Sequence, residues 1–188
     1  MSKLRKLSII LLIALLLNLS IIPSFAITTL GVSLIQQEQS NWCWAASALM
    51  VGKYAYPSTT VTQSQIVYHV KGTVDNLPAD LYESADAAMF VTNYNTGYTV
   101  HSSYFSFSTT KNYIDSGVPI MARVYRSTPA QDSLGHFYVI YGYHESSTGQ
   151  YLYIINPGDG YGYYVSYSDF LNGEWSENRL WVQSIAES

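Results

Sequence analysis

The stretch Gln37-Glu-Gln-Ser-Asn-Trp-Cys-Trp-Ala-Ala-Ser47 leads from a short polar segment into an alanine-rich run. Residues 44–54 favour an α-helix, because alanine is the strongest helix former and apolar side chains recur there at helical spacing. Cys43, the one cysteine of the chain, therefore lies directly before a helix N-terminus. The helix dipole and the unpaired backbone N–H groups there favour a thiolate, so we expect a reactive Cys43 whose pKa is lowered. The alternative is that Cys43 is an inert, buried apolar residue.

The rest of the chain divides into a helical half and a β half. Further helices are predicted over residues 62–70, 81–94 and 108–116, with a weak strand pattern over residues 98–107. β-Branched and aromatic runs between turn residues then predict strands over residues 118–125, 136–143, 151–155, 163–167 and 179–185, and a helical turn over residues 168–171. Helices followed by strands indicate an α+β domain, in which N-terminal helices pack on a C-terminal antiparallel sheet.

The composition indicates one folded domain. A chain of 188 residues with 48% hydrophobic and 12% charged residues is long enough for a core and too apolar to be disordered. The formal net charge is −4, and no lysine and arginine cluster follows residue 26, which argues against nucleic acid or an anionic membrane as a partner. One cysteine excludes an internal disulfide, and no group of side chains has the spacing of metal ligands. We therefore expect a monomer that needs neither a metal nor an organic cofactor.

The first 26 residues have the pattern of an export signal. Three basic residues and no acidic residue stand before an apolar run over residues 7–19. Ser24 and Ala26 then place small side chains at the −3 and −1 positions of a cleavage site. The apolar run is short for a membrane span, which favours cleavage over a retained anchor. We expect residues 27–188 to be a secreted, extracellular domain with no membrane attachment after cleavage.

A nucleophilic thiol needs a base, and the chain has four histidines. His136 opens the most apolar predicted strand and follows a glycine that permits close backbone approach, so we assign it as the base. His144 ends the same strand, ~26 Å away at the rise of an extended chain, so only one of the two can serve Cys43. His69 on a predicted helix and His101 in a polar strand have no distinguishing context.

A third group should orient the imidazole of the base. Asn156 ends the strand that follows His136, and antiparallel pairing of the two strands would bring both residues to the same sheet edge. Asp159, further along the turn, is the alternative orienting group. Asn156 could also be present only for its turn propensity.

A side-chain amide near the nucleophile could complete an oxyanion hole together with a backbone N–H. Three glutamines precede Cys43 at short distance in the sequence, namely Gln36, Gln37 and Gln39. Their chemistry is identical, so the residues alone do not choose among them.

These segments together resemble the papain-like cysteine peptidases, and most closely a compact, secreted bacterial branch that includes double-glycine-type peptidases. The resemblance rests on Gln37-x5-Cys43-Trp44-Ala45, Gly135-His136-Phe137 and Ile155-Asn156-Pro157, which stand in the family order, and on Asp115-Ser-Gly-Val-Pro119. It implies a papain-like fold. The roles it implies are nucleophile for Cys43, base for His136, orienting group for Asn156 and oxyanion donor for Gln37.

Two departures from the family pattern matter. The plant-type enzymes continue their asparagine block with Ser-Trp, whereas Pro157 and Gly158 follow here, so the shielding of Asn156 must come from elsewhere. Between Ala26 and Gln37 only ten residues intervene, which is too few for a folded inhibitory pro-segment.

The resemblance implies a secreted peptidase that hydrolyses a peptide or protein substrate through a Cys-His-Asn triad and an acyl-enzyme intermediate. One alternative is a thiol acyltransferase of the transglutaminase type, which would use the same residue order. Another is a binding domain without enzymatic activity on the same scaffold. The sequence does not indicate the substrate preference.

Overall fold

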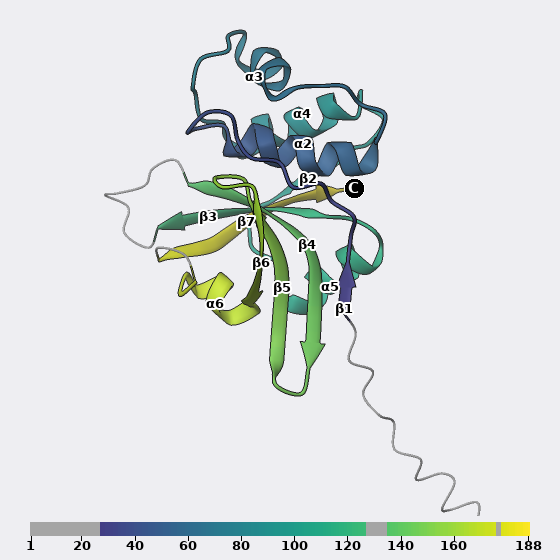
Figure 1. Ribbon diagram of the computed structural model, residues 1–188, viewed down its shortest axis with the longest axis vertical. Helices are drawn as coiled ribbons and strands as arrows, with labels where there is room; N and C mark the ends of the chain where they lie inside the picture. The colour runs from purple at the N-terminus through teal and green to yellow at the C-terminus, as the bar shows by residue number, and fades with distance from the viewer. Residues whose placement is uncertain (1–26, 127–134, 176–177) are drawn as a thin grey trace, which may run out of the picture.

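The computed structural model describes residues 27–126, 135–175 and 178–188. Its helices are α2 (Cys43–Ala55), α3 (Gln63–Lys71), α4 (Leu81–Val91), α5 (Phe107–Asp115) and α6 (Tyr167–Asn172). Its strands are β1 (Ile27–Thr29), β2 (Tyr98–His101), β3 (Ile120–Arg126), β4 (His136–Ser146), β5 (Gly149–Asn156), β6 (Tyr161–Ser166) and β7 (Arg179–Glu187). The α+β class predicted from the sequence is confirmed (Figure 1).

The described strands form one seven-stranded sheet in the order β2-β7-β3-β4-β5-β6, and β1 pairs with β4 beside this path. The strand pairs are antiparallel. β4 pairs with β3 near its start, with β1 further along, and with β5 from Val139 onward. The register opposes Val139 to Ile155, which places the start of β4 beside the end of β5.

Helices cover both faces of the sheet. Figure 1 shows α2, α3 and α4 gathered on one side of it. Met121 and Val139 face these helices in one core, whereas Ala122 and Ile140 face α5 and α6 in a second core. Successive strand residues thus point to opposite faces, and both faces are buried. The start of β4 therefore packs against α2 in the first core.

Local sequence signals explain where the helices begin and end. α3 starts at a capping box in which Thr62 accepts a hydrogen bond from the Gln65 N–H. α4 ends at Val91 rather than continuing to Tyr94. Asn93 and Tyr94 adopt left-handed backbone angles, with φ of 52° and 57°, which cannot continue a right-handed helix.

Other boundaries also differ from the sequence-based expectation. The three-residue strand β1 was not predicted, because so short an element has no periodic pattern. β2 ends at His101, and Phe105 beyond it turns into the second core. β4 continues to Ser146, because it pairs with β5 as far as Gly149. Residues 1–26, where the export signal is predicted, lie outside the described residues.

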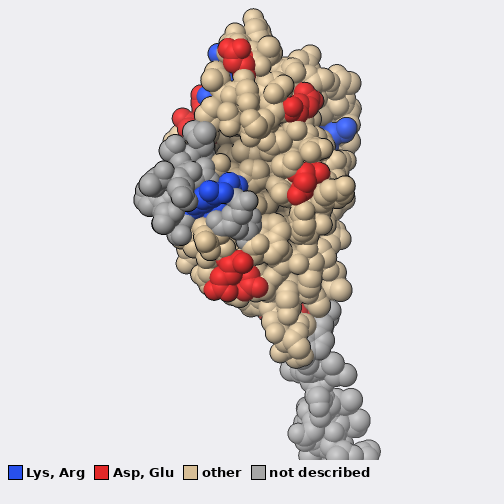
Figure 2. Space-filling model, turned by 60° about the vertical axis from the view of Figure 1, so that its left-hand side comes forward, with Lys and Arg blue, Asp and Glu red and all other residues tan. Residues whose placement is uncertain are grey.

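The surface of the described residues carries few charges. Figure 2 shows acidic and basic side chains in small separate groups on an otherwise uncharged face. Among the described residues, no helix has the length and apolar character needed to cross a membrane. Nor do the described histidine, cysteine and acidic side chains form a group that could hold a metal ion.

Candidate active site

Cys43 is the first residue of α2 and is half-buried. Trp42 caps the helix with a non-helical backbone, and its carbonyl accepts the first helical hydrogen bond from Ala46. The N–H of Cys43 therefore belongs to the first turn, where backbone donors have no partner within the helix. This position can stabilise negative charge that develops beside the sulfur.

The two tryptophans that flank Cys43 anchor a second loop beside it. The buried indole of Trp42 donates to the carbonyl of Asp75 over 3.2 Å. The buried indole of Trp44 donates to the carbonyl of Leu77 over 3.1 Å. These bonds could not be predicted from the sequence, since nothing local to the cysteine segment indicates which distant carbonyls its indoles reach.

Asn41 and Asn76 strengthen the same connection. The Asn41 N–H donates to the Asn76 side chain over 2.8 Å, and the Asn41 amide donates to the Asn76 carbonyl over 2.9 Å. The Asn76 amide donates in turn to the Ser40 hydroxyl. The loop before α4 is thereby held against the loop before α2, and its Pro78 and Ala79 form a wall beside the cysteine.

A cavity of about 170 Å³ opens at Cys43. Its lining comes from the two loops, from the start of α2, from the start of β4 and from β7: Ser40, Asn41, Cys43, Trp44, Pro78, Ala79, Gly135, His136, Phe137 and Arg179. The predicted nucleophile and the predicted base therefore share one small cavity.

Burial and the neighbouring polar groups act in opposite directions on the pKa of the Cys43 thiol. Burial raises the pKa of the thiol above its ordinary value, while the N–H groups of Phe137 and Trp44 and the charges of Arg123 and Arg179 act in the opposite direction. The expected lowering of this pKa is wrong, because loss of hydration outweighs the helix N-terminus. Phe137, the residue directly after His136, lines the same cavity as Cys43.

His136 and Asn156 meet across the β4–β5 hairpin. The distance from His136 Nε2 to Asn156 Oδ1 is 2.8 Å. An amide oxygen only accepts, so the ring donates from Nε2, and Nδ1 is left for a partner other than Asn156. The antiparallel register predicted from the sequence brings the two residues to the same edge.

Asp159 accepts a hydrogen bond from the side chain of Asn156 and fixes its orientation. Its Oδ2 accepts from Asn156 Nδ2 over 2.9 Å and from the Tyr163 hydroxyl over 2.8 Å, and its Oδ1 accepts from the Tyr161 N–H. These bonds fix the Asn156 amide with its oxygen toward His136. Of the two orienting groups considered, Asn156 contacts the imidazole and Asp159 holds the amide in place.

An aromatic cluster borders the His136–Asn156 pair. The Tyr138 ring packs edge-on against His136 with centroids 4.8 Å apart. Trp175 contacts both Tyr138 and Tyr163, at 5.5 and 5.2 Å between centroids. Through these contacts Trp175 is the residue best placed to take the shielding role that Pro157 and Gly158 cannot fill. Trp175 was not predicted as a site residue, because its only signal in the sequence is that it is a tryptophan in a polar turn.

Gln37 lies between the cysteine segment and the asparagine turn. Its N–H donates to the carbonyl of Pro157 over 2.8 Å. Its amide Nε2 donates to the carbonyls of Gln39 and Ser40, each over 2.8 Å. Both N–H groups of the amide are thus directed at loop carbonyls. One of these two hydrogen bonds must break before the amide can donate to an oxyanion. Gln36, the neighbouring alternative, is exposed and donates to the carbonyl of Gly158.

The other histidines belong to separate clusters. His69 contacts Asp86 and Tyr94 on the helical side, at 3.0 and 2.9 Å. His144 bonds to the Tyr164 hydroxyl near the far end of β4. His101 packs edge-on against Phe105, with centroids 4.8 Å apart.

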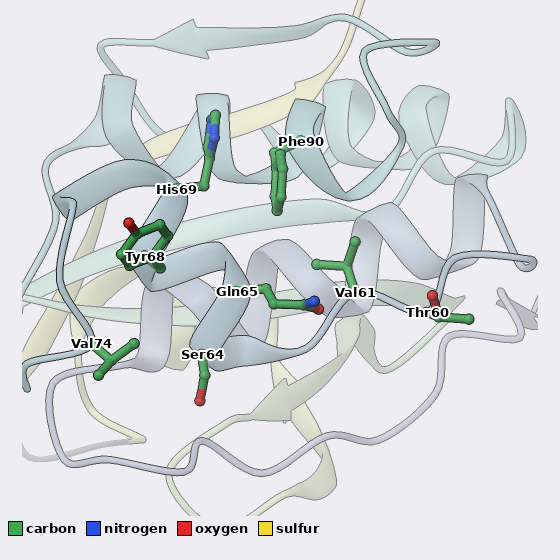
Figure 3. Close-up of a pocket in the computed structure, with 8 residues that line it drawn as sticks. All are labelled: Thr60, Val61, Ser64, Gln65, Tyr68, His69, Val74 and Phe90. Carbon is green, nitrogen blue, oxygen red and sulfur yellow. The ribbon is translucent and has the colours of Figure 1, made fainter.

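A larger surface cavity of about 660 Å³ lies along α3 (Figure 3). Its residues include His69, Phe90 and Tyr68. The lining contains neither Cys43 nor His136. The smaller cavity, which holds both, is therefore the candidate active site despite its size.

Comparisons with known proteins bear on this site. A family model described as the Peptidase_C39 like family matches residues 29–180. A search of the curated proteins found no match. The chain is similar to a crystal structure described as that of a C39-like peptidase from Bacillus anthracis, with 15% identity and a TM-score of 0.57 over 87% of this chain and 98% of that chain.

A second solved structure is that of a double glycine motif protease from an AMS/PCAT transporter, in complex with the leader peptide. Its identity to this chain is 18%, and its TM-score is 0.57 over 85% of this chain and 94% of that chain. At such identities the two structures show a shared fold, whereas the family model covers most of the sequence. The chain belongs to the peptidase C39-like family and is a papain-like cysteine peptidase.

Proposed function

We propose that this protein hydrolyses peptide bonds with Cys43 as nucleophile, His136 as base and Asn156 as the orienting group. The observation that carries the proposal is the 2.8 Å bond from His136 Nε2 to Asn156 Oδ1, made by a histidine that lines the same small cavity as Cys43. A nucleophile, a base and a group that orients the base are the parts that acyl transfer requires.

The proposed reaction begins with proton transfer from Cys43 to His136. His136 accepts the thiol proton at Nδ1, and the sulfur attacks the substrate carbonyl. Asn156 accepts from Nε2 throughout and stabilises the imidazolium that forms. The imidazolium then protonates the leaving amine, and water attacks the thioester with His136 again as base, which releases the acid and restores the thiol.

The oxyanion of each tetrahedral intermediate needs preorganised donors. The N–H of Cys43 in the first turn of α2 supplies one. The Gln37 amide supplies the second donor when it breaks one of its two hydrogen bonds to loop carbonyls. This proposal for Gln37 is supported by its position between the cysteine loop and the Asn156 turn.

An extended peptide is the substrate class that suits the narrow cavity between Pro78 and Gly135. The neighbouring structure with a leader peptide supports a peptide ligand. We further propose that the protein acts as a monomer outside the cell after cleavage behind Ala26. The mature N-terminus of secreted protein in a culture medium tests this, with Ile27 expected as the first residue.

The activity is tested by incubating the purified protein and its Cys43→Ala variant with casein, and separating the products by mass spectrometry. We expect cleavage by the parent protein and none by the variant. A parallel reaction contains a fluorescent primary amine. Incorporation of the amine into casein without cleavage would identify the activity as acyl transfer instead of hydrolysis. If neither cleavage nor incorporation occurs, the result favours a binding domain without enzymatic activity.

A further inference from the structure

Gln63 is a polar side chain that is only 2% exposed, although it lies in the first turn of α3 and far from the cysteine in sequence. Its Nε2 donates to the carbonyl of Gln36 over 2.8 Å. Its Oε1 accepts from the N–H of Glu38 over 3.0 Å. Both ends of one buried amide are therefore used on the two residues that flank Gln37.

This pairing fixes the backbone of Gln37 on both sides. In an extended segment, the backbone groups of alternate residues point to the same side. The Gln36 carbonyl and the Glu38 N–H therefore point to one side, and the Gln37 N–H points to the other. Gln63 occupies the first side, and the carbonyl of Pro157 accepts from the Gln37 N–H on the second. The segment is thereby held between α3 and the turn that follows Asn156.

The packing on the turn side is also close. Gly160 has a φ of +75°, and a Cβ at this position would stand 3.0 Å from the Cβ of Gln36. The turn therefore contacts the segment without side chains between them. If the contact with Gln63 on the α3 side is lost, the segment can shift, and the Gln37 amide then moves relative to Cys43 and Asn156.

We propose that Gln63 is a positioning residue for the oxyanion donor: its amide sets the place of Gln37 relative to Cys43. This inference rests on the proposed function, because it requires that Gln37 acts on the oxyanion. A displacement of about 1 Å at a catalytic group can lower a rate about 100-fold. Loss of Gln63 should therefore lower kcat, with KM much less affected, since the oxyanion develops only in the transition state.

The first test compares Gln63→Leu with the matched control Gln65→Ala by steady-state kinetics on one peptide substrate. Gln65 belongs to the capping box of the same helix, so its loss weakens α3 without touching the Gln37 segment. We expect Gln63→Leu to lower kcat about 10- to 100-fold, with KM changed less than about threefold. We expect Gln65→Ala to lower the thermal midpoint and to retain kcat.

The second test uses Gln63→Glu, because its carboxyl can be switched. The ionised carboxylate accepts from the Glu38 N–H but repels the Gln36 carbonyl, whereas the protonated acid has an O–H donor and an acceptor like the native amide. The ratio of the variant kcat to the parent kcat should therefore rise as the pH is lowered from 8 to 5. A merely structural role of Gln63 would leave this ratio flat once folding has been verified at each pH.

Iodoacetamide labelling of Cys43 separates this inference from the proposed function, because alkylation needs no oxyanion donor. We expect equal labelling rates in the parent and in both Gln63 variants. An active parent whose Gln63 variants keep kcat, or lose it only in step with Gln65→Ala, overturns the inference alone. A parent that labels but does not cleave peptides overturns the proposed function, and the role of Gln63 falls with it.

Discussion

His136, the first residue of β4, donates a hydrogen bond over 2.8 Å to Asn156, the last residue of β5. The two strands form one antiparallel hairpin, so the first residue of β4 lies at the same end of the hairpin as the last residue of β5. The fold therefore orients the imidazole by strand register rather than by a mobile loop.

Replacement of Asp159 by alanine should lower kcat about 10- to 100-fold, because the Asn156 amide loses the acceptor that turns its oxygen toward His136. Tyr163→Phe is the control, since it removes one hydrogen bond to Asp159 and leaves the bond from Asn156. Steady-state kinetics on one peptide substrate measure both. Full activity of Asp159→Ala would mean that another contact orients the amide.

Alkylation of Cys43 should show a thiol that ionises less readily in the folded protein than in the unfolded chain. Burial raises the pKa of the folded form, so the native state retains its proton at pH values where the unfolded thiol has lost it. The iodoacetamide rate should therefore rise with pH and reach its midpoint later in native protein than in urea. The stability contributed by the neutral thiol is present below the unfolded pKa and is lost as the pH rises through the folded pKa. A native midpoint below the unfolded one would instead indicate a preformed ion pair with His136.

Trp175→Ala should lower kcat about tenfold, or ~1.4 kcal/mol, because water then reaches the His136–Asn156 bond and weakens it. Trp175→Phe retains an aromatic ring against Tyr138 and should keep most of the activity. The pair of variants is compared at equal folded fraction, verified by circular dichroism. Equal kinetics for the alanine variant and the parent would assign Trp175 to packing alone.

Gln37→Ala should lower kcat about 10²- to 10³-fold, or about 2.7–4 kcal/mol, with a much smaller effect on KM, because the amide acts on charge that develops in the transition state. Gln36→Ala and Gln39→Ala should lower it far less, since both side chains are exposed. Gln37→Glu should be worse than alanine, because a carboxylate cannot donate and repels an oxyanion. A large loss in Gln39→Ala with an active Gln37→Ala would move the donor two residues along the chain.

The features that the sequence predicts well are those with local patterns. The alanine-rich run after Cys43 indicates α2, and the β-branched and aromatic runs between turn residues indicate β4 and β5. The meeting of His136 and Asn156 is expected once these two strands pair antiparallel. Strand β1 has no such pattern, because three residues are too few to show a period.

The remaining features depend on contacts between distant segments. The Trp44 indole reaches the carbonyl of Leu77, and Gln63 reaches the backbone around Gln37, through packing that no local pattern encodes. The pKa of Cys43 is a further example. The sequence places the thiol at a helix N-terminus and so suggests a lowered pKa, but burial by other elements reverses the direction.

Turnover of one peptide substrate by four single histidine-to-alanine variants decides whether His136 is the base for Cys43. His69, His101 and His144 belong to other clusters, so their replacement should leave kcat/KM close to that of the parent protein. His136→Ala should abolish turnover while the protein remains folded. A His136→Ala variant that still cleaves the peptide, or a loss of turnover confined to one of the other three variants, would show that His136 is not the base.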